Sequence, residues 1–132
     1  MSSGHKTLKA IAVDDEQHCI DTLLWELKRH CPEVEICRTF SDPEQAYEEL
    51  KEAEIDVLFL DIHLQSTSGI ELLERLMPVD YHVIFITAYD EYALKAFDLA
   101  ATHYLLKPVN GKKLKAAIKR IDDSPAQVSR ET

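Results

Sequence analysis

The chain has 132 residues, the length of one ordinary domain and enough to bury a hydrophobic core. Its 15 Lys and Arg residues against 24 Asp and Glu residues give a formal net charge of −9, which disfavours non-specific attraction to nucleic acid or to an anionic membrane surface. The chain starts without the apolar core of a signal peptide, and no apolar run approaches the roughly 20 residues that span a bilayer. We therefore expect a cytoplasmic protein of one domain, with neither DNA nor a membrane as a direct partner.

The first third of the chain predicts a strand, an acidic loop, a helix and a second strand. A small apolar strand at 8–13 leads straight into three acidic residues. Apolar side chains then recur at helical spacing over 20–31, and Pro32 ends the predicted helix. Residues 34–40 alternate between apolar and polar, which is typical of a strand near the edge of a sheet. The acidic residues after the first strand are Asp14, Asp15 and Glu16.

The middle of the chain predicts a helix and then a deeply buried strand. Asp42 and Pro43 supply an N-cap and a first-turn proline, so a helix is expected from Pro43 to about Ala53. The mainly apolar run over 55–60 is typical of a parallel strand buried on both faces, and Asp61 follows it directly. Because open α/β sheets bind ligands at the carboxyl ends of their strands, we expect Asp61 to serve chemistry rather than packing.

Two more helices and another central strand follow. Ser68 has the spacing of a helix cap, and the helix that it begins stops before Pro78. A second continuous apolar strand over 83–86 ends at Thr87. Asp90 is expected to cap a fourth helix with a narrow apolar stripe of mostly small residues, which bury little area and should hold this helix loosely. The stripe consists of Ala93, Ala96, Phe97 and Ala100.

A short strand at 104–106 ends at Lys107, and a closing helix carries its apolar residues over 114–121. Strands and helices thus alternate five times, which predicts a flavodoxin-like, doubly wound α/β fold: five helices around a five-stranded parallel sheet of order 2-1-3-4-5. We place this domain at 6–123, after a disordered start at 1–5 and before a linker or tail at 124–132.

Polar residues at the strand ends would meet at one edge of this sheet: Asp14, Asp15, Asp61, Thr87 and Lys107. Carboxylates that share a cleft raise each other's proton affinity unless a divalent cation or an ammonium group joins them, and oxygen-only ligands suit Mg²⁺. With such an ion, Asp61 can attack a phosphoryl group whose oxygens contact Lys107 and Thr87. Each residue alone also has a structural explanation, such as an ion pair between Lys107 and Asp61, but four strand ends together favour a site.

These residues carry a resemblance to the receiver domains of response regulators in two-component signalling. The resemblance covers essentially all of residues 6–123 and implies that a sensor histidine kinase phosphorylates Asp61 with Mg²⁺ as cofactor. Asp15, Asp61 and the backbone carbonyl of His63 would hold the ion, and Asp14 would reach it through water. The segments that carry the resemblance are VDDE (13–16), LFLDI (58–62), SGIELL (68–73), ITAY (86–89) and YLLKPV (104–109).

The resemblance also implies how the phosphoryl group is read out. Thr87 and Lys107 would contact it, and Tyr104 would be a switch aromatic that turns inward and changes the surface made by the fourth helix, fifth strand and fifth helix, where partners or a second copy dock. The segment TAYDEYALKAF (87–97), together with YLLKPV (104–109), further resembles LytTR-class regulators, whose DNA-binding domain follows the receiver. DNA would then be reached only through an output domain absent from this chain; alternatively the chain is a stand-alone receiver.

Several positions depart from the family pattern or allow another interpretation. Receivers usually carry Met-Pro where this chain has Leu64 and Gln65, which would loosen the loop without removing a ligand group. A side-chain metal ligand at His63 is the lesser alternative, since its ring should point to solvent. Tyr89 is expected to shield the acyl phosphate from water. Cysteines at 19, 31 and 37 lack disulfide or metal spacing and are expected to be reduced, buried thiols.

Three rival functions remain open. A haloacid-dehalogenase-like phosphatase also uses a strand-end Asp, but it needs a second acid where this chain has His63. An FMN binder of the flavodoxin type needs a phosphate loop rich in glycine and hydroxyl groups where this chain has three acids. A pseudo-receiver would act only as an interaction module, although all the acceptor-site groups are present.

Overall fold

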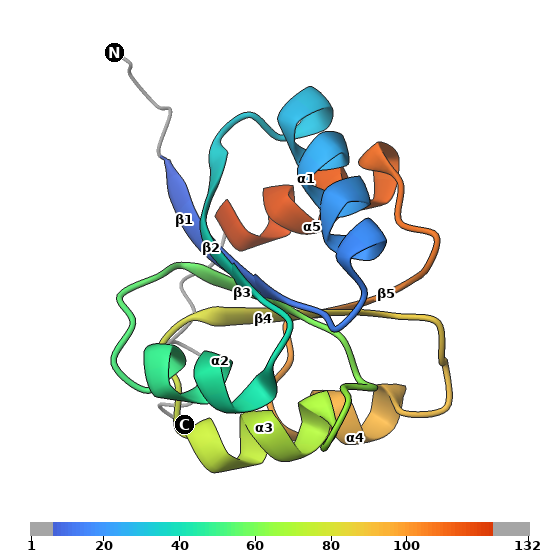
Figure 1. Cartoon of the computed structure of the whole chain (residues 1–132). Coiled ribbons are helices and arrows are strands. Elements are labelled where there is room, and N and C mark those ends of the chain that lie inside the picture. Colours follow the sequence, from blue (N-terminus) through green and yellow to red (C-terminus); the bar gives the residue numbers. More distant parts are fainter. Residues whose placement is uncertain (1–6, 123–132) are drawn as a thin grey trace.

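The computed structural model describes residues 7–122, so the expected start and tail lie outside the described residues. Strands and helices alternate along the chain, much as the sequence predicts (Figure 1). In chain order they are β1 (Leu8–Val13), α1 (Gln17–His30), β2 (Val34–Phe40), α2 (Pro43–Leu50), β3 (Val57–Leu60), α3 (Gly69–Leu76), β4 (His82–Thr87), α4 (Ala93–Asp98), β5 (His103–Leu106) and α5 (Gly111–Asp122).

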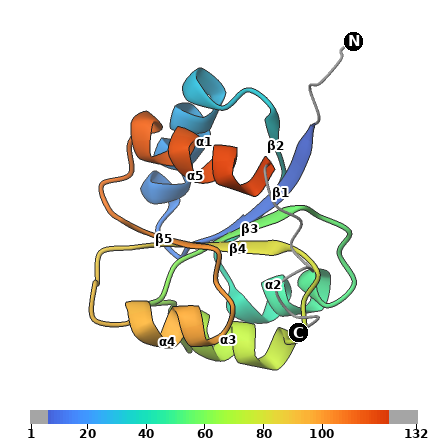
Figure 2. The same cartoon turned by 180° about the vertical axis from the view of Figure 1, so that it is seen from behind.

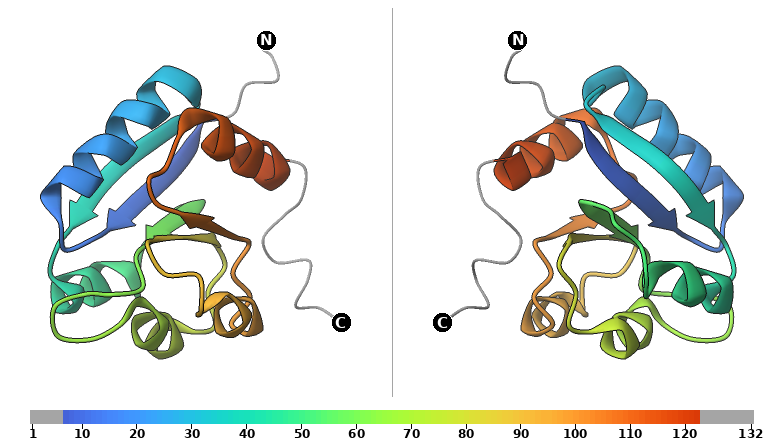
Figure 3. Two further views of the ribbon diagram at one scale, coloured as in Figure 1. Left: turned by 90° about the vertical axis from the view of Figure 1, so that its right-hand side faces the viewer. Right: turned by 90° about the vertical axis from the view of Figure 1, so that its left-hand side faces the viewer.

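The strands form one parallel sheet of five strands in the order β2-β1-β3-β4-β5, which confirms the predicted topology. Helices cover both faces: α1 and α5 pack against each other on one face, and α2, α3 and α4 lie on the other (Figures 1 and 2). The side views show these three layers edge-on (Figure 3). All five strands therefore point their carboxyl ends towards one edge of the domain.

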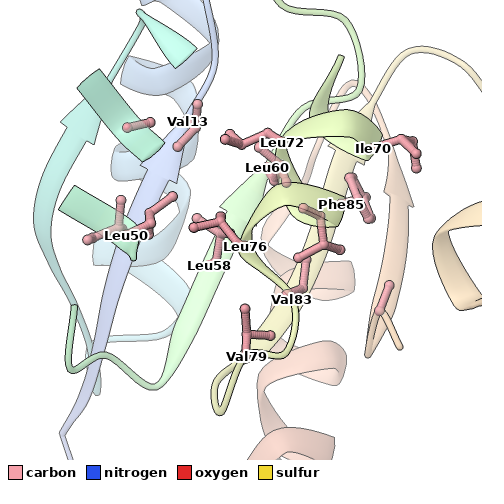
Figure 4. Close-up of a cluster of buried hydrophobic side chains, with 14 of the residues drawn as sticks. Val13, Leu50, Leu58, Leu60, Ile70, Leu72, Leu76, Val79, Val83 and Phe85 are labelled. Carbon is pink, nitrogen blue, oxygen red and sulfur yellow. The ribbon is translucent and has the colours of Figure 1, made fainter. Parts of the chain in front are cut away.

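Alternation along the strands divides the core into two clusters, one on each face of the sheet. In β1, Ile11 and Val13 belong to the cluster under α2 and α3, whereas Ala10 and Ala12 belong to the cluster under α1 and α5. Figure 4 shows part of the first cluster, where leucines of β3 meet leucines of α2 and α3. Full burial of a large apolar side chain contributes about 1.5–3 kcal/mol, so these clusters fix the strands that end at the polar edge.

Two predicted boundaries near β3 differ from the structure. Helix α2 ends at Leu50 instead of Ala53, and β3 begins at Val57 instead of Ile55. The side chain of Asp56 accepts a hydrogen bond from the backbone N–H of Lys9 at 2.8 Å, so a carboxylate takes the place of a strand carbonyl at this end of the ladder. The predicted caps at Asp42 and Ser68 are confirmed, since each side chain accepts a backbone N–H of its helix.

The prediction for α4 was wrong in two respects. Its N-cap is Tyr92, which makes no side-chain cap, so Asp90 does not cap the helix. Of the predicted stripe only Ala96 is buried in the six-residue helix, and Ala100 lies beyond it with a left-handed φ of 71°. With one buried residue the helix itself buries little apolar area, and its loose attachment to the sheet stays a prediction.

The three cysteines, all within residues 7–122, are free as expected, but only Cys31 is buried. Cys19 on α1 is half-buried, and Cys37 on the edge strand β2 is exposed. Among the described residues, no helix combines the length and the hydrophobicity that crossing a bilayer requires.

Candidate functional site: an acidic pocket at the carboxyl edge

The strand register brings the predicted site residues together. Val13 of β1 is paired with Leu60 of β3, so Asp14 and Asp61, one residue further on, leave the sheet side by side. The backbone N–H of Asp61 donates to the carbonyl of Val13 at 3.1 Å, which holds this arrangement one step beyond the strands. On the other side of β3, the strands β4 and β5 end together, because the N–H of Lys107 donates to the carbonyl of Thr87 at 2.8 Å.

Lys107 bridges the two buried carboxylates. Its Nζ lies 2.9 Å from Oδ2 of Asp14 and 2.9 Å from Oδ2 of Asp61. Each carboxylate also accepts a backbone N–H through its other oxygen: Glu16 donates to Asp14 at 3.0 Å, and Ile62 donates to Asp61 at 2.6 Å. These bonds fix both carboxylates and leave Asp61 held by one side chain and one peptide group.

The pocket places like charges close together at low solvent exposure. Asp14 is 8% exposed, and burial raises the pKa of its carboxyl group; the nearby Asp61 raises it too, whereas the N–H of Glu16 and the Lys107 ammonium lower it. Burial alone lowers the pKa of Lys107, but its bonds to Asp61 and Asp14 outweigh this, so the pKa lies above its ordinary range. Lys107 therefore stays charged, and the pocket carries an excess of negative charge.

The donor set fits a hard divalent cation. The side chains of Asp14, Asp15 and Asp61 each offer a carboxylate oxygen, and these oxygens all lie within 4.8 Å of one another. Oxygen-only ligands and the partly exposed Asp15, which leaves room for water, match the preference of Mg²⁺. The structure thus brings together the three carboxylates that the sequence predicts as metal ligands. It does not place the imidazole of His63 in that group.

His63 instead belongs to an aromatic cluster close to Asp61 in the sequence. Its exposed ring packs against Tyr89, with ring centroids 4.1 Å apart, and against Tyr92 at 5.6 Å. The ring of His63 is exposed, as expected, but it also contacts two tyrosines. The contact with Tyr92 was not predicted, because Tyr92 lies far from His63 in the sequence. The predicted roles of the His63 carbonyl and of Tyr89 remain predictions.

Thr87 and Tyr104 occupy the positions that the sequence predicts, on adjacent strands. Thr87 is fully buried, and its Oγ1 lies 3.4 Å from the backbone N–H of Tyr89, which donates to it. Tyr104 is half-buried, and its hydroxyl donates to the backbone carbonyl of Tyr89. The loop after β4 thus links the buried hydroxyl to the tyrosine ring.

Gly69 is a position beside Asp61 that the sequence reasoning did not single out. A Cβ at this position would overlap the backbone carbonyl of Asp61, so only glycine lets the start of α3 approach Asp61 so closely. Its N–H donates to the carbonyl of Ile62 at 2.6 Å and closes the loop after Asp61. In this loop Leu64 is buried and Gln65 is exposed. Sequence alone offers no signal for such contact, since SGIELL reads simply as a helix start.

A cavity of about 370 Å³ adjoins the pocket, between the start of α1 and the ends of the strands. Asp14, Asp61 and Lys107 line it together with apolar side chains of β1, β3 and β4. Its lining also includes Glu16, His18 and Cys19 from the start of α1, which the sequence reasoning did not assign to any site.

Comparison with known proteins gives one consistent match. The family model described as "Response regulator receiver domain" matches residues 10–119. An uncharacterized response regulatory protein of Vibrio parahaemolyticus is 40% identical over 116 residues, which are 87% of this chain and 48% of that protein. The sensory transduction protein LytT of Bacillus subtilis is 36% identical over 115 residues, 86% of this chain and 47% of that protein. The chain therefore spans about half the length of these curated relatives.

Solved structures agree with the fold. The response regulatory domain of protein mrkE from Klebsiella pneumoniae superposes with a TM-score of 0.79 at 30% identity, covering 88% of this chain and 96% of that chain. A CheY-like receiver domain protein from Methanospirillum hungatei has a TM-score of 0.76 at 24% identity, covering 89% of this chain and 95% of that one. At this level of identity the second match concerns the fold alone.

Proposed function

This chain belongs to the family of response-regulator receiver domains of two-component signalling, and on that premise we propose that Asp61 accepts a phosphoryl group from a sensor histidine kinase in a Mg²⁺-dependent reaction. The observation that carries the proposal is the convergence of Asp14, Asp61 and Lys107, with Nζ 2.9 Å from both carboxylates. Such a domain is a phosphoacceptor in signalling rather than an enzyme that turns over a separate substrate.

The proposed reaction is a transfer to a carboxylate oxygen. The P–O bond to Asp61 forms as the P–N bond to the donor histidine breaks, and the electron pair of that bond returns to the imidazole. The N–H of Ile62 orients the Asp61 carboxylate, while the Lys107 ammonium lies where it can contact a phosphoryl oxygen. Mg²⁺ held by Asp14, Asp15 and Asp61 would supply further positive charge to the phosphoryl oxygens.

We further propose that Thr87 and Tyr104 carry the signal to the surface. A phosphoryl group adds three strong acceptor oxygens and about −1.5 to −2 charges. A hydrogen bond from Thr87 to one of them would draw the loop after β4 inward, and the loop carries the Tyr89 carbonyl that Tyr104 now contacts. Breaking that contact frees Tyr104 to turn towards Phe85, whose ring centroid lies 6.1 Å away.

The surface formed by α4, β5 and α5 is the proposed docking face for a second copy or an output domain. Leu94 and Phe97 of α4 are 83% and 50% exposed, and Leu106 of β5 is 38% exposed, so apolar side chains are available there. The LytT relatives are about twice as long as this chain, which supports an output of the LytTR class, with DNA as the target of that missing part. A stand-alone receiver that acts as an interaction module is the alternative.

The decisive experiment is incubation with acetyl phosphate and Mg²⁺, followed by intact mass measurement. The protein should gain the mass of one phosphoryl group, and Asp61→Asn should gain none. Asp80→Asn is the matched control, because Asp80 is exposed and precedes β4 at the opposite edge of the sheet. An unmodified wild-type protein, or equal modification of the Asp61→Asn variant, would reject the acceptor role.

A readout experiment tests the coupling separately. Beryllofluoride with Mg²⁺ mimics the phosphoryl group, and NMR spectra should then show shifted amides both at the acidic pocket and across α4 and β5. Shifts confined to the acidic pocket would contradict the proposed path through Thr87 and Tyr104. Asp61→Asn serves as the control that should show neither set.

A further inference from the structure

Three different metal-binding side chains meet at the start of α1, where they line the same cavity as Asp14, Asp61 and Lys107. The thiol of Cys19 lies 3.4 Å from Oε1 of Glu16 and 3.6 Å from Nε2 of His18. The ligand atoms of all three side chains lie within 4.8 Å of one another. The Glu16 side chain makes no capping hydrogen bond to the backbone of the helix, and its Oε1 accepts the thiol hydrogen of Cys19.

These separations resemble those of a tetrahedral zinc site. With Zn–S near 2.3 Å and Zn–N or Zn–O near 2.0–2.1 Å, neighbouring donor atoms in a tetrahedron lie about 3.3–3.6 Å apart. The two contacts of the Cys19 sulfur fall at that spacing without any change of rotamer. The two remaining side chains are exposed, so they are free to close the last edge of the tetrahedron.

We propose that Glu16, His18 and Cys19 bind a borderline-soft divalent ion of the Zn²⁺ class, with a fourth position open to water. The structure gives this ion a different donor set from the hard, oxygen-only group of Asp14, Asp15 and Asp61. Thiolate and imidazole ligands select Zn²⁺ and similar ions, whereas carboxylates alone suit Mg²⁺. One face of the domain thus offers two neighbouring cation sites of opposite preference.

The charge balance of the site favours such an ion. On binding, the thiol of Cys19 releases its proton to solvent, and the resulting thiolate and the Glu16 carboxylate together neutralise the two positive charges of the metal. A neutral site is not opposed by the positive end of the α1 dipole, which would disfavour an uncompensated cation. All three side chains line the cavity of about 370 Å³ that reaches Asp61 and Lys107, which gives water access to the fourth position.

Cobalt titration tests this proposal directly. Co²⁺ takes the same ligands as Zn²⁺, and a thiolate ligand produces a sulfur-to-cobalt charge-transfer band in the near ultraviolet. The full chain, kept reduced with a phosphine and in excess Mg²⁺ so that the oxygen site is filled, should develop this band and saturate at one Co²⁺ per chain. Zn²⁺ should then displace the cobalt and remove the band.

Single substitutions assign the ligands. Cys19→Ser should abolish the band, and His18→Gln and Glu16→Gln should each weaken binding at least about tenfold, since even partners outside the metal's own ligands are worth 10–100-fold. The matched controls are Cys37→Ser, which removes the exposed cysteine, and His30→Gln, at the other end of α1; both should bind like the wild type. Circular dichroism of each variant establishes that it is folded.

The proposal does not depend on phosphorylation, so the Asp61→Asn variant should bind Co²⁺ with unchanged affinity. Absence of the charge-transfer band in the wild-type protein would overturn the proposal. A band that survives Cys19→Ser, or that disappears in Cys37→Ser, would do the same, because the metal would then be bound elsewhere.

Discussion

The interior of the sheet and its carboxyl edge are formed by the same strands, but burial has opposite effects on their stability. It stabilises the apolar side chains of the interior and destabilises the charged side chains of the edge. Leu58 and Leu60 of β3 are buried in an apolar cluster, where the loss of water contact stabilises the fold. Asp61, the next residue after the strand, is 7% exposed, yet its burial is unfavourable unless a cation or hydrogen bond offsets it. The interior therefore supplies the stability that holds the buried charged side chains of the edge in place, and these side chains form the candidate site.

The largest change in the free energy of unfolding is expected when a buried side chain of the interior is truncated. Leu58 is completely buried at the centre of β3, so Leu58→Ala should lower the free energy of unfolding by about 2–5 kcal/mol through lost burial and a residual cavity. Urea unfolding monitored by circular dichroism gives this value from the midpoint at constant m.

The matched control for this truncation is the same substitution at a solvent-exposed leucine. Leu94 in α4 is 83% exposed, so Leu94→Ala should change the free energy of unfolding by no more than about 0.5 kcal/mol. A loss at Leu94 as large as that at Leu58 would contradict the prediction that α4 is loosely held.

A smaller change, a gain in the free energy of unfolding, is expected when Mg²⁺ binds at the carboxyl edge. At a Mg²⁺ concentration of ten times the dissociation constant, binding to the folded protein adds about 1.4 kcal/mol to the free energy of unfolding. Asp15→Asn should reduce this gain, since it removes one of the three carboxylates without touching the Lys107 bridge. Thermal unfolding with and without Mg²⁺ measures both values.

The control for the Mg²⁺ effect is Asp80→Asn, which removes an exposed carboxylate at the opposite edge and should leave the gain intact. An equal gain in wild type and Asp15→Asn would remove Asp15 from the proposed ligands. The gain should also disappear in acid, because carboxylates must be ionised to bind the ion.

The same contrast explains what the sequence could predict. The sheet and its strand order could be predicted from apolar runs such as 55–60, because the interior of a parallel sheet accepts almost exclusively apolar side chains. Asp61, Thr87 and Lys107 were found because a polar group directly after an apolar run marks the strand end. The register then brings such groups together without further information.

Features that depend on side-chain rotamers or close approach were not predictable. The fourth helix was misassigned at Asp90, because in a six-residue helix packing on β5 outweighs a local capping signal. Gly69 was missed because its requirement comes from the carbonyl of Asp61, eight positions earlier and brought near only by the fold. Glu16 and Cys19 are three residues apart, which helical geometry brings together, but the contact of His18 with Cys19 depends on side-chain rotamers that the sequence does not show.

Removing the charge of Asp14 should show, through the pH dependence of stability, how much the burial of this carboxylate destabilises the folded protein. Burial raises the pKa of Asp14, so its contribution to stability is fully present below the ordinary Asp pKa of about 3.9 and is lost as pH rises through the folded-state pKa. Asp14→Asn carries no such penalty. Without Mg²⁺, its stability relative to wild type should therefore increase from pH 3 to pH 7, as measured by urea unfolding.

A stability difference for Asp14→Asn that stays flat from pH 3 to pH 7 would mean that the Lys107 bridge fully compensates the burial of that carboxylate.

The smallest expected effect concerns the edge after phosphorylation and changes a rate rather than stability. Tyr89 is 41% exposed and its ring packs on His63, two residues after Asp61 in the sequence, and its predicted role is to shield the acyl phosphate from water. Tyr89→Ala should leave the free energy of unfolding within about 0.5 kcal/mol of wild type but shorten the lifetime of the acyl phosphate, because water reaches phosphorus more easily. Intact mass followed over time after removal of acetyl phosphate measures that lifetime. Tyr47→Ala, at a partly buried tyrosine on α2, controls for a general loss of aromatic packing. Equal lifetimes of wild type and Tyr89→Ala would contradict the prediction. They would mean that the carboxylates and Lys107 alone protect the phosphoryl group.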